Sequence, residues 1–82
     1  MQAFVTPKQL KAARALLGWD QEQLAISAGV SKPTIARLEN SATGTRGNLN
    51  TIRSIIEALT KNGIRLLGPN EEGVGVLLKD VE

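Results

Sequence analysis

The chain of 82 residues carries ten Lys or Arg, eight Asp or Glu, no His and no Cys. Its length suits a single domain spanning residues 1–82, in which nearly every apolar side chain must contribute to the core. Because thiols and imidazoles are missing, disulfides, the commonest metal ligands and imidazole-dependent catalysis are excluded. We therefore expect a protein that is not an enzyme and needs no cofactor or metal.

The chain also lacks the signals of export or membrane insertion. Its first five residues are too short for the apolar part of a signal peptide, and no apolar run approaches the ~20 residues that span a bilayer. The absence of cysteine fits a reducing compartment. We therefore expect a cytoplasmic protein with no membrane contact.

Charge is distributed unevenly along the chain. Nine basic and four acidic residues lie between Met1 and Arg65, whereas one basic and four acidic residues lie between Leu66 and Glu82. The body is therefore basic and the tail acidic. A basic body indicates an anionic partner.

The first three quarters of the chain carry the start and stop signals of four helices. We predict them at about residues 6–17, 20–28, 31–40 and 48–62. Thr6 and Asp20 are each followed three residues later by Gln, as in a capping box, and Gly18 and Gly29 supply left-handed stops. Ser31 has the side chain to cap the third helix. The apolar positions at helical spacing on the first and fourth helices are Leu10, Ala13, Leu16, Leu17, Leu49, Ile52, Ile55, Ile56 and Leu59.

The pattern changes after Gly63. Two short apolar runs, separated by the turn-rich residues 68–73, predict a β-hairpin over about residues 64–79. A lone two-stranded ribbon is marginally stable in water, so the hairpin should pack on the helices or pair with another copy of the chain. Residues 41–47 have the composition of a loop.

The segment between Gln21 and Leu38 has the spacing of two crossed helices joined by a tight turn. A small residue, Ala25, stands where the helices approach each other, and Gly29 permits the positive φ of the turn. Val30, Ile35 and Leu38 then fill the space between the helices. These five positions identify a fold, and function must rest on the exposed residues around them.

With these residues in register, the segment DQEQLAISAGVSKPTIARLEN resembles the helix-turn-helix of Cro- and lambda-repressor-like (XRE-type) bacterial and phage regulators, and the likeness extends from about Leu10 to Leu59. The resemblance implies a mainly α fold, a four-helix lambda-repressor-like domain, here followed by a two-stranded β-hairpin. It also implies that the third helix enters the major groove of DNA. Many relatives have a fifth helix where this chain has the predicted hairpin, so a dimer geometry is not transferred.

The resemblance places four residues of the third helix against the bases: Lys32, Pro33, Thr34 and Arg37. Lys and Arg can donate to guanine O6 and N7, and Thr can contact base edges. Pro33 departs from the family, which often has a polar residue there, and offers only apolar contact, for example to a thymine methyl group.

Phosphate contacts are expected from the amino ends of helices and from the loop before the fourth helix. The candidates are Gln21, Ser31, Thr43, Thr45 and Arg46. The resemblance further implies that Arg14 on the first helix pairs with Glu39 at the end of the third.

These features favour a sequence-specific, double-stranded DNA-binding transcriptional regulator of the repressor type. Because one recognition helix offers few base contacts, we expect a homodimer on two half-sites, with the hairpin as a candidate interface. With two aromatic residues in the chain, a surface built on base stacking is disfavoured.

An alternative is a helix-turn-helix module that binds a protein, either as an antiactivator masking a transcription factor or as an antitoxin partnered with a toxin. The small net charge, Pro33, and the apolar Leu67 and Leu77 on the ribbon keep this alternative open.

Overall fold

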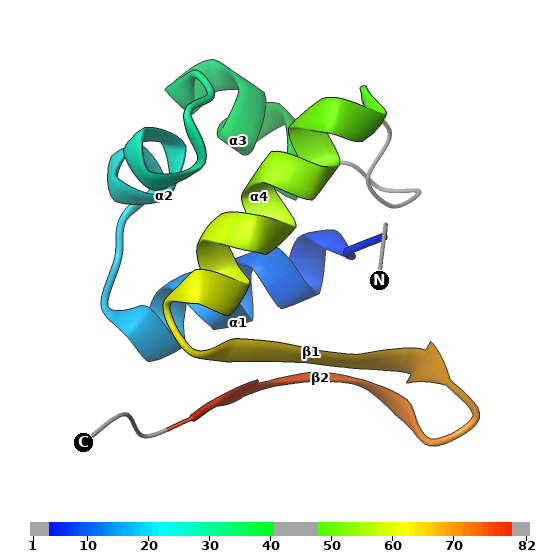
Figure 1. Cartoon of the computed structure of the whole chain (residues 1–82). Helices are drawn as coiled ribbons and strands as arrows, with labels where there is room; N and C mark the ends of the chain where they lie inside the picture. The colour runs from blue at the N-terminus through cyan, green and yellow to red at the C-terminus, as the bar shows by residue number, and fades with distance from the viewer. Residues whose placement is uncertain (1–3, 41–47, 80–82) are drawn as a thin grey trace.

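The computed structural model describes residues 4–40 and 48–79. In chain order, its elements are α1 (Pro7–Leu17), α2 (Gln21–Ala28), α3 (Lys32–Glu39), α4 (Leu49–Lys61), β1 (Ile64–Asn70) and β2 (Gly73–Leu78). The predicted fold class, mainly helical with a C-terminal antiparallel hairpin, is confirmed. Figure 1 shows α3 at one end of the molecule and the hairpin at the other, with α1 and α4 between them.

The helix ends follow from local side-chain chemistry. The Thr6 hydroxyl accepts a hydrogen bond from the Gln9 backbone N–H at 3.0 Å, and the Gln9 side chain accepts one from the Thr6 N–H at 2.9 Å. Asp20 and Gln23 form the same reciprocal pair at the start of α2. Because each box satisfies two N–H groups that have no partner within the helix, both starts are fixed by the sequence.

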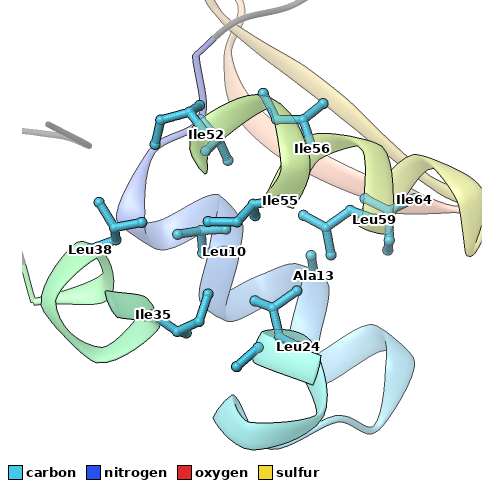
Figure 2. Close-up of a cluster of buried hydrophobic side chains, with 12 residues drawn as sticks. Leu10, Ala13, Leu24, Ile35, Leu38, Ile52, Ile55, Ile56, Leu59 and Ile64 are labelled. Carbon is cyan, nitrogen blue, oxygen red and sulfur yellow. The ribbon is translucent and has the colours of Figure 1, made fainter. Parts of the chain in front are cut away.

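One apolar core joins the four helices to the first residue of the hairpin. Figure 2 shows side chains from α1, α2, α3 and α4 converging on it, with Ile64 at its edge. Two predicted stripe positions are wrong, since Leu16 is 45% exposed and Leu49 is 55% exposed. Leu16 is displaced by more than a quarter turn from the line through Leu10 and Leu17, at about 100° per residue. Leu49 is the first residue of α4, nearly one turn before the buried Ile52.

The turn of the hairpin is shorter than its sequence pattern predicted, because β1 extends to Asn70. The register runs from Ile64 opposite Leu78 to Leu67 opposite Gly75, shifts, and resumes with Asn70 opposite Gly73. The loop is therefore reduced to two residues, where Glu72 N–H donates to the Asn70 side chain at 2.9 Å. Gly68 makes the shift possible because its φ is +72°, and a Cβ there would collide with the Gly73 carbonyl oxygen.

A buried glutamine fastens the hairpin to α1. Beyond its role in the capping box, the Gln9 amide nitrogen donates to the carbonyl oxygens of Leu67 at 3.2 Å, Gly68 at 3.3 Å and Gly75 at 3.1 Å. Its side chain is almost fully buried. The sequence indicated only the local contact of Gln9, because its hairpin partners lie more than 55 positions further along the chain.

Candidate nucleic-acid interface

The turn between α2 and α3 is tight and is closed by backbone hydrogen bonds. Gly29 has φ +71°, which lets the Val30 N–H donate to the Ala25 carbonyl at 3.0 Å and the Gly29 N–H donate to Ile26 at 3.2 Å. Ala25 is 3% exposed where the two helices pack together. The turn therefore holds α3 in one orientation relative to α2.

One face of α3 is buried and the other is open. Ile35 and Leu38 point into the core, as Figure 2 shows. Pro33 and Arg37 are exposed on the opposite side, and Lys32 is exposed at the start of the helix. The hairpin packs on α1 and α4 and leaves this face uncovered. The outward side of α3 is thus cationic and accessible, because the helix's own carboxylate, Glu39, points inward.

The amino end of α3 is closed by side-chain hydrogen bonds. Ser31 Oγ accepts from the Thr34 N–H at 3.2 Å and lies 2.7 Å from the Thr34 hydroxyl. Pro33 has no N–H to offer. The first turn of α3 therefore has little free N–H capacity for a phosphate, and the Thr34 side chain presents its methyl group more readily than its hydroxyl.

A buried ionic cluster fixes the other end of α3. Arg14 Nε donates to Glu39 Oε2 at 2.7 Å and its Nη2 donates to Oε1 at 2.8 Å, which makes a bidentate pair. The Glu39 side chain is 2% exposed and that of Arg14 is 20% exposed. Arg14 also donates to the Trp19 carbonyl at 3.2 Å. Its hydrogen bonds with Glu39 raise the pKa of the Arg14 guanidinium above the ordinary value, against the opposing effect of burial.

The cluster has a third member that sequence reasoning missed. The Gln21 amide donates to Glu39 Oε1 at 3.1 Å, so the carboxylate receives bonds from both α1 and α2. The sequence offered one signal for this hydrogen bond. Gln21 lies two residues after Trp19, whose carbonyl oxygen accepts a hydrogen bond from Arg14. Three helices are therefore joined at one carboxylate directly behind the exposed face of α3.

A family model described as helix-turn-helix matches residues 10–62, which covers α1 to α4. The chain belongs to this helix-turn-helix family. Membership makes it a DNA-binding protein of the XRE and lambda-repressor-like regulatory type. No curated protein matches the sequence significantly.

The remaining predicted site residues of this helix-turn-helix protein are distributed as follows. Thr43, Thr45 and Arg46 lie outside the described residues. Gln21 is half-buried in the ionic cluster, and one amide hydrogen and its carbonyl oxygen remain to face solvent or a phosphate. Within residues 4–40 and 48–79, no group of three or more acidic residues forms a metal site, and no helix is long and apolar enough to cross a membrane.

Proposed function

We propose that the protein is a sequence-specific regulator that represses transcription in the cytoplasm by inserting α3 into the major groove of double-stranded DNA. The observation that carries this proposal is the open, cationic face of α3 on a support fixed by the buried Arg14–Glu39 pair. A rigid support lowers the entropic cost of presenting side chains to the bases. This role requires no catalytic group.

The side chains of α3 divide the work of recognition. Arg37 donates to guanine O6 and N7 as a fork, and Lys32 donates as a point charge to a guanine or a phosphate. Pro33 and the Thr34 methyl group contact thymine methyl groups. Gln21 binds a phosphate at the amino end of α2, helped by the helix dipole. Ser31, Thr43, Thr45 and Arg46 are further candidates for phosphate contacts, with Ser31 weakened by its role as a cap.

The proposed regulator acts as a homodimer that joins through the distal half of the hairpin. Near the turn, Leu67 on β1 is 41% exposed opposite Gly75, and Val74, the neighbour of Gly75 on β2, is 48% exposed. Apolar side chains that stand exposed on a two-stranded ribbon gain stability from a partner surface. Sedimentation velocity of the Leu67→Glu and Val74→Glu double variant tests this, because an unchanged dimer would locate the contact elsewhere.

Selection of bound fragments from random double-stranded DNA tests the function itself. The expected product is a pseudo-palindrome with half-site centres about 10 base pairs apart, or a multiple of that spacing. The affinity for the recovered site should fall with salt at a log–log slope near −0.9 per phosphate contacted. Failure to enrich any sequence, with the protein folded by circular dichroism, would refute sequence-specific binding.

A further inference from the structure

A groove of about 860 Å³ lies between α4 and β1, on elements that take no part in the α2–α3 face. Its apolar lining comes from Ile56 on α4, from Ile64 and Leu66 on β1, and from Leu77 on β2. This volume falls within the range of clefts that bind ligands in other proteins. The groove is therefore large enough to hold several residues of an extended peptide.

The outer backbone edge of β1 faces this groove. Lys79 N–H donates to the Gly63 carbonyl at 2.8 Å, so positions 63 and 79 form a hydrogen-bonded pair. Hydrogen-bonded and non-hydrogen-bonded pairs alternate along an antiparallel ribbon. The backbone N–H and C=O groups of Arg65 and Leu67 therefore point toward β2, and those of Ile64 and Leu66 point away from it. Among the residues that the structure describes, the sheet contains β1 and β2 alone. The outer edge of β1 therefore presents two N–H and two C=O groups to an incoming strand.

The charges around the groove determine which kind of incoming strand it favours. Arg53, Lys61, Arg65 and Lys79 line it together with one carboxylate, Glu57. Because Glu57 lies one helical turn from both Arg53 and Lys61, its charge is opposed on two sides. The rim consequently carries an excess of positive charge, which favours an acidic segment and steers its approach.

We propose that this groove binds an extended acidic segment of a partner protein, which adds to the sheet as a third strand along β1. Alternate side chains of the segment would be apolar and enter the lining around Ile56 and Leu66, while the intervening acidic ones would meet Lys61 and Arg65. A second copy of this chain is a poorer occupant of the same edge. A two-fold axis at the β1 edge would bring the Arg65 side chains of both copies together, and like charges on facing strands are destabilising.

A titration tests the proposal. The full chain is titrated with a fluorescent ten-residue peptide in which glutamate alternates with valine and leucine, and the amide NMR shifts of the chain are then measured. Saturable binding with shifts at α4 and β1 is the expected result. The Lys61→Glu and Arg65→Glu double variant should bind about tenfold more weakly. The matched control, Lys8→Glu and Lys11→Glu on the exposed side of α1, should bind as the parent does.

Two peptide variants separate strand addition from simple charge attraction. In an added strand, the N–H groups of every second peptide residue donate to β1, so N-methylation of these residues should abolish binding. N-methylation of the intervening residues, whose N–H groups point away from β1, should preserve binding. Equal effects of the two sets would overturn strand addition. No saturation up to about 1 mM peptide would overturn the site itself. In the Leu67→Glu and Val74→Glu variant, which removes the proposed dimer contact, shifts at Ile64 and Leu66 that depend on protein concentration without peptide would assign the edge to a second copy and overturn the proposed occupant.

Discussion

The two ends of this molecule present surfaces of opposite character. At the α2–α3 end, charged side chains project from a helix whose amino end is capped by Ser31 and whose only carboxylate is buried. At the α4–hairpin end, apolar side chains and the outer edge of β1 lie beside a basic rim. Side chains can read base edges, whereas a strand edge recognises another strand. One small core thus supports two surfaces suited to different partners.

The two ends are also held in place differently. The α2–α3 end depends on a charged pair that links α1 to α3 across 25 positions of the chain. The hairpin end depends on the neutral amide of Gln9, which reaches the strands from α1. Separate perturbation of these two buried groups should therefore disturb one surface and spare the other.

The largest expected effect is on stability at the α2–α3 end. Glu39→Ala should lower the free energy of unfolding by about 3 kcal/mol, because it leaves the partly buried Arg14 without its charged partner. Glu22→Ala, at an exposed position in the first turn of α2, is the control and should cost less than about 1 kcal/mol. Urea denaturation, monitored by circular dichroism, measures the free energy of unfolding of both variants. Equal losses in the two variants would show that the ionic cluster does not stabilise the fold more than an exposed charge does.

A smaller loss of stability is expected when the hydrogen bonds that hold the hairpin to α1 are removed. Gln9→Met should lower the free energy of unfolding by about 2 kcal/mol, since it removes the buried hydrogen bonds to the strands at nearly constant volume. Gln23→Met removes the same capping position from α2 at an exposed site and should cost about 0.5 kcal/mol. Amide exchange should accelerate throughout β1 and β2 in the first variant. Unchanged exchange there would show that Gln9 does not hold the hairpin.

The smallest effect expected is a change in DNA affinity at Gln21. Gln21→Ala should weaken operator binding by about 1 kcal/mol and leave the salt slope unchanged, because a neutral amide that binds a phosphate releases no counterion, while the ionic pair behind it persists. Gln23→Ala, two residues further along α2, serves as the control. Should the operator affinity stay at the parent value in fluorescence anisotropy, Gln21 would be a structural member of the cluster alone.

Much of the fold could be predicted because its signals are local. The capping boxes at Thr6 and Asp20 and the glycine stops at positions 18 and 29 act within four residues, so the sequence alone specifies them. The reach of Gln9 to the hairpin could not be predicted, because capping already explained that residue and its partners are remote in sequence. The exposure of Leu49 escaped prediction because its angular position on α4 matches the apolar stripe, whereas its place at the helix terminus does not.

The candidate site also has features that the sequence could predict and features that it could not. The exposure of Arg37 follows from helical spacing once Ile35 and Leu38 are assigned to the core, whereas Lys32, three residues before Ile35, is exposed at the first position of α3. Pairing of Arg14 with Glu39 came from the family resemblance and not from spacing, since no local signal connects positions 25 residues apart. The bond from Gln21 to the same carboxylate depends on how three helices meet, which only the structure reveals.

The central claim is that the outward face of α3 reads DNA, and one measurement tests it most directly. Anisotropy titrations of a selected operator and a scrambled duplex should show that Lys32→Ala combined with Arg37→Ala reduces operator affinity to the level of the scrambled duplex, with the fold intact. The same preference for the operator in this double variant and in the parent protein would contradict the account.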